Sequence, residues 1–280
     1  MEADLAQIAG LKWAVPLILR VAFPLMTACQ SAQISDEVDR AFRSLPERYL
    51  GAPPGFTASW HIRLGDIGRS WEVRCTTHGA RVRAGRAGQK PDVTIGTDAQ
   101  TWLELREGRI NGIEAFSQRR LYVRGDLDLA VGFEGMFRLA GGRPPLLRIH
   151  DVPVGRLSIS TLTMGEGPDV ILLHGLGATK SSLFDAAAGL AREGYRVHAL
   201  DLPGFGGSSK HPAPFGAAFF TKTVLGVMDE MGIERAHVVG NSMGGRVALE
   251  VGLRAPERVS GLALLCPAVA FVRRGYHPIV

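Results

Sequence analysis

The stretch His237–Leu253, HVVGNSMGGRVALEVGL, places a serine between glycines at the point where an apolar run gives way to a helical pattern. The residues before Gly240 predict a buried strand, and those after Gly244 repeat apolar side chains at helical spacing. Between the two glycines the chain matches the motif G-x-S-x-G, with Ser242 at its centre. The pattern predicts a strand, a tight turn and a helix, although an ordinary glycine-rich turn before a helix would satisfy it equally.

The residues around this motif favour the first interpretation, because short apolar runs alternate with helical patterns. Strands are expected at residues 157–163, 170–173, 195–200, 236–239 and 259–265, and helices at 181–192 and 216–231. Alternation of this kind predicts an α/β domain with a doubly wound parallel sheet that helices cover on both faces.

Two further motifs follow predicted strands. The sequence reads HGLG at residues 174–177, DLPGFGGS at 201–208 and GNSMGG at 240–245. In this order and spacing the three motifs resemble those of the α/β-hydrolase family, over residues 156–280. The resemblance implies that Ser242 is a nucleophile, and that the backbone N–H groups of Met243 and of Leu176 or Gly177 form an oxyanion hole. It implies structural roles for His174, Gly175, Gly240 and Gly244.

The identity of the reaction stays open at this point. Asn241 and Met243, which flank the serine, resemble hydrolases that cleave carbon–carbon bonds of ring-fission products, but ester hydrolases share such flanks. A phosphate-binding loop is a weaker alternative for residues 175–181, because Thr179 stands where that loop needs a glycine.

A serine hydrolase of this fold also needs an acid and then a histidine after the serine. No aspartate follows Ser242; the later acids are Glu250 and Glu257, and the later histidine is His277. We therefore expect a hydrolase domain that lacks its last strands, either because the sequence is truncated or because the protein has no resident triad. His277 is a weak candidate for the base.

The first half of the chain predicts an α+β unit. Residues 56–64, 71–76 and 80–84 alternate apolar and polar side chains, which predicts an antiparallel meander. Further strands are expected at 91–97 and 121–124, and helices at 36–45, 99–107, 112–116 and 126–139.

This unit resembles the sterol carrier protein type 2 family over residues 36–139. The resemblance rests on Trp60 and Trp71, on PDVTIGTDAQTWLELREGRINGIEAF (91–116) and on YVRGDLDLAVGF (122–133). It implies an apolar tunnel for sterols, fatty acids or acyl chains. Candidate lipid contacts are Trp102, Phe116, Phe133 and Phe137; alternatively, these side chains simply fill a packed core.

Four segments are therefore expected: an apolar arm (1–34), a lipid-binding domain (35–140), a linker (141–153) and the incomplete hydrolase domain (154–280). The linker prediction rests on its two glycines and three prolines. Prolines and Arg20 interrupt the apolar stretch of the arm, so we expect it to dock on the protein or lie at a membrane interface rather than span a membrane. The residues that end at Cys29 match a lipoprotein cleavage box only loosely, so lipidation is the weaker alternative.

Composition limits the partners. The formal net charge is +5, and basic residues alternate along a predicted strand, which favours a solvated sheet face over a nucleic-acid surface. Three scattered cysteines are too few for a disulfide framework or a metal site, so we expect a cytoplasmic protein without metal or cofactor. Peripheral contact with an anionic membrane stays open.

Two functions follow. The first is a serine hydrolase that acts on an ester or another apolar acyl or lipid-like substrate, with an attached lipid-binding domain. The alternative is a non-catalytic lipid or sterol carrier whose hydrolase half is a scaffold or remnant.

Overall fold

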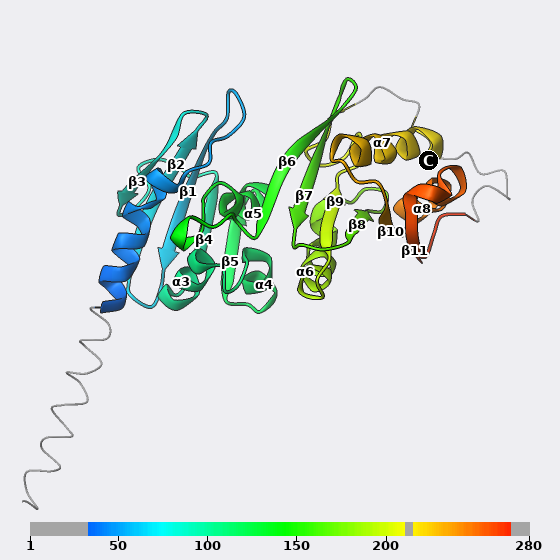
Figure 1. Cartoon of the computed structure of the whole chain (residues 1–280). Coiled ribbons are helices and arrows are strands. Elements are labelled where there is room, and N and C mark those ends of the chain that lie inside the picture. The colour runs from blue at the N-terminus through cyan, green and yellow to red at the C-terminus, as the bar shows by residue number, and fades with distance from the viewer. Residues whose placement is uncertain (1–32, 211–214, 270–280) are drawn as a thin grey trace, which may run out of the picture.

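The computed structural model describes residues 33–210 and 215–269. All but the last two residues of the predicted arm therefore lie outside the described residues, as does His277. The chain forms two units that lie side by side (Figure 1), an N-terminal unit of residues 33–139 and a C-terminal unit of residues 147–269. Among the described residues, no helix has the length and apolar character needed to cross a membrane.

The N-terminal unit contains a five-stranded sheet of order β3-β2-β1-β4-β5. Its strands are β1 (Thr57–Leu64), β2 (Arg69–Thr76), β3 (Gly79–Ala84), β4 (Val93–Thr97) and β5 (Leu121–Gly125). The predicted meander of β1, β2 and β3 is confirmed, with Trp60 opposite Val73 and Val73 opposite Val82. However, β4 pairs in parallel with β1, which local alternation could not reveal because the partner strand is distant in sequence.

Helices pack on this sheet. They comprise helical residues 33–43, α2 (Leu45–Arg48), α3 (Ala99–Glu107), α4 (Gly112–Ser117), α5 (Leu127–Gly135) and the short 3₁₀ turn η2 (Ala140–Gly142). Side chains that accept backbone N–H bonds begin three of them: Asp98 caps α3, Asn111 caps α4 and Asp126 caps α5. Such caps satisfy N–H groups that have no partner inside the helix, which fixes where each helix starts.

Aromatic rings form the centre of this core. The ring of Phe42 stacks between Trp71, at 4.1 Å, and Trp102, at 4.5 Å. The first helical residues, strand β2 and helix α3 thus meet at one stack, which includes Trp71, one of the two tryptophans on which the family resemblance rests.

The C-terminal unit contains a six-stranded sheet of order β11-β10-β8-β9-β7-β6. Its strands are β6 (Leu147–Val154), β7 (Leu157–Met164), β8 (Asp169–Leu173), β9 (Arg196–Leu200), β10 (Ala236–Asn241) and β11 (Val259–Leu265). Strands β8 to β11 are parallel, as predicted, whereas β6 and β7 form an antiparallel hairpin at one edge.

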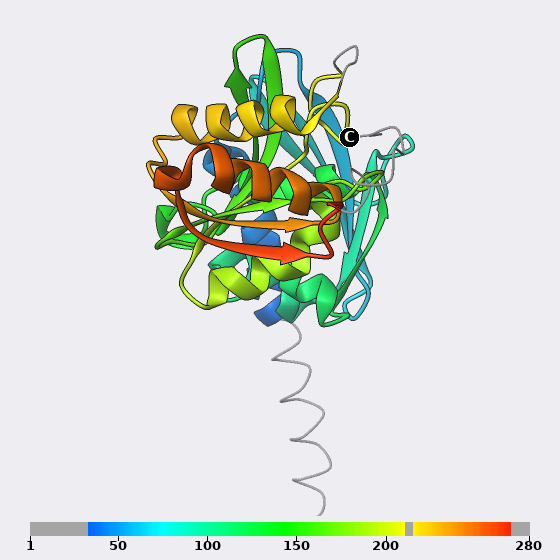
Figure 2. The same cartoon turned by 90° about the vertical axis from the view of Figure 1, so that its right-hand side faces the viewer.

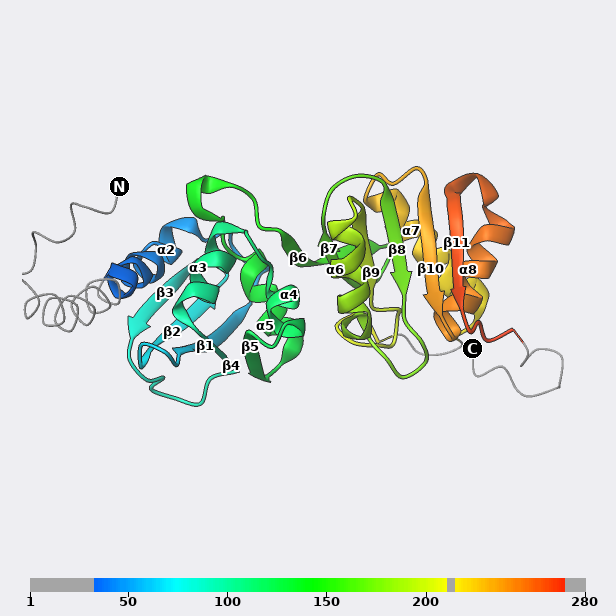
Figure 3. The ribbon, with the colours of Figure 1, turned by 90° about the horizontal axis from the view of Figure 1, so that it is seen from below.

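The prediction that residues 141–153 form a linker is partly wrong. From Leu147 onward it forms β6, which pairs along its whole length with β7. Pro153 sits near the end of this edge strand, where a missing N–H removes no ladder bond to a further strand. Only residues 141–146 connect the two units, and β6 leads directly into the second sheet (Figure 3).

Helices cover both faces of this sheet, as the alternation predicts (Figure 2). They are η3 (Lys180–Leu183), α6 (Phe184–Arg192), α7 (Ala217–Glu230), α8 (Met243–Arg254) and η4 (Pro256–Arg258). Ile171 and Leu173 of β8 face the core under α7 and α8, whereas Val170 and Leu172 face the core under α6. A buried strand with apolar residues on both faces is typical of a parallel sheet.

The two units share part of their core. Ile113 of α4 and Val131 of α5 belong to the same buried cluster as Phe184 of α6. At the rim, Arg192 pairs with Glu114 at 3.1 Å. The units are therefore joined by packed side chains and not merely by the chain between them.

Candidate functional site

Ser242 stands at the turn that the motif predicts. It follows β10 directly and is the N-cap of α8, with φ 52° and ψ −110°. Its backbone N–H donates to the carbonyl of Leu265 at 2.8 Å, and its own carbonyl accepts from Arg246 and Ala268. A non-glycine residue with such dihedral angles costs on the order of 1–3 kcal/mol and persists only where the surroundings determine it. The turn is a strained one, held by β11 and α8.

The glycines of the motif are explained by close approach. A Cβ atom added to Gly240 would lie 2.2 Å from the carbonyl oxygen of Gly244, and one added to Gly244 would lie 2.3 Å from that of Leu173. A Cβ on Gly175 would lie 3.5 Å from the Cβ of Ser242. The loop after β8 therefore runs directly beside the serine.

Two backbone N–H groups predicted to form an oxyanion hole have no hydrogen-bond acceptor among the described residues. Met243 is the first residue of α8, so its N–H has no partner within the helix. Neither it nor the N–H of Leu176 donates a hydrogen bond to another residue in the described part of the chain. Leu176 is 52% exposed, at the open side of the loop that carries Gly175.

His174 is bonded at both ring nitrogens. Its Nδ1 lies 2.8 Å from the carbonyl oxygen of Gly175, and its Nε2 accepts the N–H of Leu202 at 3.0 Å. Because Nε2 is an acceptor, the proton resides on Nδ1, and burial lowers the pKa of this histidine. The imidazole is neutral and joins the loop after β8 to the loop after β9, which leaves no nitrogen for a proton-transfer role.

No described histidine or carboxylate is bonded to the Ser242 hydroxyl. An Asp–His pair does exist, with Asp169 Oδ1 2.8 Å from His198 Nε2. However, Asp169 begins β8, whereas Ser242 follows the opposite, carboxyl end of the parallel strands. A five-residue strand separates those edges by roughly 13 Å, so this pair does not serve the serine.

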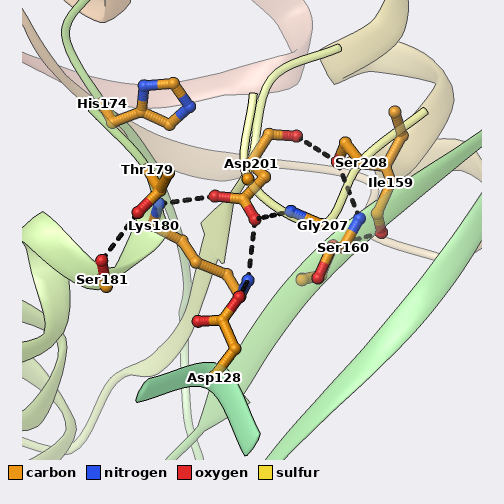
Figure 4. A network of polar contacts seen from close by, with 12 residues as sticks. Asp128, Ile159, Ser160, His174, Thr179, Lys180, Ser181, Asp201, Gly207 and Ser208 are labelled. Atoms are coloured by element: carbon orange, nitrogen blue, oxygen red, sulfur yellow. Dashed lines mark hydrogen bonds and ion pairs between the residues drawn. The ribbon is translucent and has the colours of Figure 1, made fainter. Parts of the chain in front are cut away.

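A buried ionic network lies behind the HGLG loop (Figure 4). Lys180 is 0% exposed, and its Nζ lies 2.7 Å from Asp201 Oδ2 and 2.6 Å from Asp128 Oδ2. The backbone N–H of Lys180 donates to the other oxygen of Asp201, and Gly207 donates to Oδ2. The network thus ties three segments: the loop after β8, the DLPG segment, and α5 of the N-terminal unit.

The sequence pattern associates Lys180 only with a possible phosphate-binding loop. The ion pairs of Lys180 with Asp201 and Asp128 were not predicted from the sequence. Two carboxylates already neutralise its ammonium group inside the fold, which removes the free charge that a phosphate would require. Asp201 at the start of DLPGFGGS was the one available signal, but Asp128 lies too far away in sequence to be connected with it.

An apolar cavity of about 180 Å³ opens in the N-terminal unit. Trp102, Phe116, Phe133 and Phe137, the four candidate lipid contacts, all line it. Three of them also belong to or border the packed core, since Trp102 is 6%, Phe133 7% and Phe137 5% exposed. Residues of the C-terminal unit, among them Phe184, complete one wall. The cavity is therefore a feature of both units.

Two carboxyl-bearing residues, Glu134 and Asp185, are among those that line this cavity. Glu134 Oε2 accepts the N–H of Gly112 at 2.7 Å, whereas its Oε1 is buried with no hydrogen-bond partner among the described residues. Burial, assisted by the nearby negative charge of Glu114, raises the pKa of Glu134 to about 8. The group is thus a neutral carboxylic acid near pH 7.

Glu134→Gln is expected to flatten the pH dependence of stability. The folded protein holds a proton that the unfolded chain releases between the ordinary pKa of 4.5 and about 8. The free energy of unfolding of the wild type should consequently fall with rising pH in this window, by up to about 1.4 kcal/mol per unit relative to the variant. Urea unfolding at several pH values measures the difference, and parallel profiles would contradict the assignment.

Comparison with known proteins identifies both units. Residues 55–138 match the SCP-2 sterol transfer family, and residues 168–277 match the alpha/beta hydrolase fold. The chain joins a sterol-transfer domain to an alpha/beta hydrolase domain. Both family resemblances and the fold class predicted from the sequence are thereby confirmed.

Curated relatives of the hydrolase domain have several activities. The chain is 34% identical to a dihydrolipoyllysine-residue acetyltransferase component of an acetoin cleaving system from Pseudomonas putida, over 64% of this chain and 46% of that protein. It is 33% identical to a pimeloyl-[acyl-carrier protein] methyl ester esterase from Aeromonas hydrophila, over 44% of this chain and 46% of the esterase.

A third relative is named for a different substrate. The chain is 41% identical to a 2-hydroxy-6-oxononadienedioate/2-hydroxy-6-oxononatrienedioate hydrolase from Comamonas testosteroni, over 42% of this chain and 43% of that enzyme. The chain spans less than half the length of each of these three relatives. They place the domain among hydrolases without distinguishing one substrate.

A resident metal is not indicated by side-chain clusters. Within residues 33–210 and 215–269, no group of three or more His, Cys, Asp or Glu side chains is arranged to hold an ion.

Proposed function

We propose that the protein is a serine hydrolase that cleaves an ester of an apolar acyl substrate. The observation that carries the proposal is the strained conformation of Ser242, with φ 52° and ψ −110°, beside the HGLG loop at the carboxyl edge of the sheet. Packing alone does not explain backbone strain at this half-buried serine, which stands between two sterically required glycines.

The proposed reaction begins with attack of Ser242 Oγ on the ester carbonyl carbon. The carbonyl oxygen becomes an oxyanion, which the N–H groups of Met243 and Leu176 stabilise. A general base takes the hydroxyl proton and returns it to the leaving alcohol, and water then cleaves the acyl-serine bond. We assign no residue to the base or to its acid partner, because no histidine or carboxylate within residues 33–210 and 215–269 is bonded to the Ser242 hydroxyl.

Ester cleavage is favoured over carbon–carbon cleavage by the attached domain. A domain of the SCP-2 sterol transfer family with an apolar cavity beside the hydrolase domain suits a substrate with a long apolar acyl part. The pimeloyl ester esterase among the relatives acts, by its name, on an acyl ester. The flanks Asn241 and Met243, which ring-fission hydrolases share, fit either bond.

The test is covalent labelling of the whole protein with a fluorophosphonate probe. An activated serine should become phosphonylated, and mass spectrometry should locate the adduct on the tryptic peptide that contains Ser242. Protein denatured before labelling is the control for non-specific reaction. Absence of an adduct on folded protein would overturn the proposal.

The second candidate function is a non-catalytic lipid carrier. The observation that favours it is the absence of a histidine or carboxylate partner for Ser242 among the described residues. It requires that no ester be hydrolysed and no adduct form, whereas lipid binding persists. The labelling experiment therefore separates the two functions directly.

A further inference from the structure

The HGLG loop is anchored at each of its ends to one short segment after β9. At its start, His174 Nε2 accepts the N–H of Leu202 at 3.0 Å. At its end, the backbone N–H of Lys180 donates to Asp201 Oδ1 at 2.6 Å, and Lys180 Nζ lies 2.7 Å from Asp201 Oδ2 (Figure 4). The position of the residues between the anchors, Leu176 among them, therefore depends on both.

Between the anchors the loop has few contacts that would fix it. The N–H of Ala178 donates to the carbonyl of Gly175 at 3.2 Å, which is a bond within the loop itself. Neither Leu176 nor Gly177 donates a backbone hydrogen bond to another segment among the residues that the structure describes. The side chain of Leu176 is exposed, so packing does not hold it either. A segment with so few bonds of its own takes its geometry from its ends.

The second anchor, at Lys180, includes a residue of the sterol-transfer domain. The ammonium group of Lys180 is completely buried, so its N–H groups need acceptors inside the protein. Asp201 Oδ2 is one acceptor, but it also accepts the N–H of Gly207 at 2.8 Å. Asp128 Oδ2, which lies 2.6 Å from Lys180 Nζ, is the other, and Asp128 belongs to α5. Without Asp128, the ammonium group would keep a single, shared acceptor among the described residues.

The place of this contact indicates that it does more than join the two domains. Arg192 and Glu114 form another ion pair between the domains, at the rim, where the Arg192 side chain is 66% exposed. Lys180, by contrast, is withdrawn from water and ends the loop that carries Leu176. Removing an ammonium group from water is unfavourable unless its partners are well placed, so a contact that only joined the domains would be less costly at the surface. The buried lysine is explained if its carboxylate partners also fix the loop.

We propose that Asp128 is a positioning residue of the hydrolase site: it holds Lys180, and thereby the loop whose Leu176 N–H stabilises the oxyanion. The sterol-transfer domain thus contributes an acceptor without which the oxyanion hole is less well formed. The inference deepens the proposed serine hydrolase function and rests on it, because both concern the same oxyanion hole. The negative oxygen exists in the transition state and not in the bound ester, so a displaced donor should slow turnover without weakening substrate binding.

The experiment compares Asp128→Ala with the wild type, both as whole protein. Two rates are followed: hydrolysis of the p-nitrophenyl ester of octanoic acid, and covalent labelling of Ser242 by a fluorophosphonate, whose phosphoryl oxygen would occupy the same hole. Loss of an oxyanion donor costs about 10²–10³ in kcat. A donor that is displaced but present should cost less, so we expect kcat and the labelling rate to fall on the order of tenfold, with KM unchanged.

Arg192→Met is the matched control, because it breaks the ion pair with Glu114 between the domains and is the last residue of α6, at the opposite end of that helix from the loop. Both of its rates should equal those of the wild type. Asp128→Glu keeps a carboxylate on a flexible side chain and should recover most of the rate that the alanine variant loses. Urea unfolding verifies that each variant is folded. If the alanine variant does not fold, Asp128→Asn takes its place, with a smaller effect in the same direction.

Amide hydrogen exchange supplies a readout that does not require turnover. Exchange within residues 174–183 should be faster in Asp128→Ala than in the wild type, and unchanged in Arg192→Met. If the wild type is labelled, unaltered exchange or an unaltered labelling rate in the folded Asp128 variant overturns the positioning role alone, as does an equal loss in Arg192→Met. Absence of labelling in the wild type overturns the proposed hydrolase, and the positioning role falls with it.

Discussion

Ser242→Gly is expected to make the protein more stable and to abolish its reaction with fluorophosphonates and esters. Glycine adopts positive φ without the Cβ clash, so the substitution releases strain that costs Ser242 on the order of 1–3 kcal/mol. Part of this gain is offset by the greater freedom of glycine in the unfolded chain. The net rise in the free energy of unfolding should be about 1 kcal/mol.

Ser242→Ala is the matched control, because alanine keeps the Cβ atom and the strain but lacks the hydroxyl. Its stability should remain near that of the wild type, while turnover falls to the level that binding and an oxyanion hole provide, roughly 10³–10⁴-fold over water. Urea unfolding and ester hydrolysis are measured on the same preparations. A glycine variant no more stable than the alanine variant would show that the turn is not strained, and undiminished turnover in either would exclude Ser242 as nucleophile.

The turn could be predicted from sequence because its geometry restricts residue type. Gly240 and Gly244 approach backbone carbonyls so closely that no other residue fits, and Gly175 lies against Ser242. Each restriction acts within a few residues of a strand end, so it appears as a short motif at fixed spacing. The hydrolase fold could be predicted for the same reason, because three such motifs follow predicted strands.

The pairing of strands that are distant in sequence could not be predicted from local patterns. The parallel pairing of β4 with β1 and the strand β6 within the predicted linker depend on neighbours far along the chain. Composition misled at β6 because four of the five glycines and prolines of the predicted linker lie at residues 141–145, directly before the strand, and Pro153 lies within it.

Some residues of the candidate site could likewise be predicted from the sequence, and others could not. Side chains that line the cavity could be proposed as a group because a family resemblance covers them, and Trp102, Phe116, Phe133 and Phe137 do lie there. The buried, unpartnered Oε1 of Glu134 could not be foreseen, because most glutamates are solvated and only the folded structure shows which of them are buried without a partner. The same holds for the Lys180 network.

Lys180→Met is expected to destabilise the protein by about 3–5 kcal/mol, since it leaves the carboxylate of Asp201 buried without its positive partner. Lys180 and Asp201 are both 0% exposed, whereas Asp128 is 35% exposed. Asp128→Asn, the matched control, removes only this partly solvated contact between the domains and should cost about 1 kcal/mol or less. Urea unfolding measures both variants, and equal losses would contradict the distinction between buried and exposed partners.

The pH dependence of the Lys180→Met effect gives a second test with a definite sign. Burial acts to raise the pKa of Asp201, but hydrogen bonds and the charge of Lys180 hold it below its ordinary value of 3.8. In the wild type this carboxylate therefore contributes stability above that value, and the contribution is lost as the pH falls through the lower folded pKa. Without Lys180, burial dominates and the carboxyl is protonated at a higher pH, which relieves the buried charge. The deficit of the variant should consequently be largest near neutral pH and shrink toward pH 4; a constant deficit would mean that lost packing, and not the unpaired charge, causes the destabilisation.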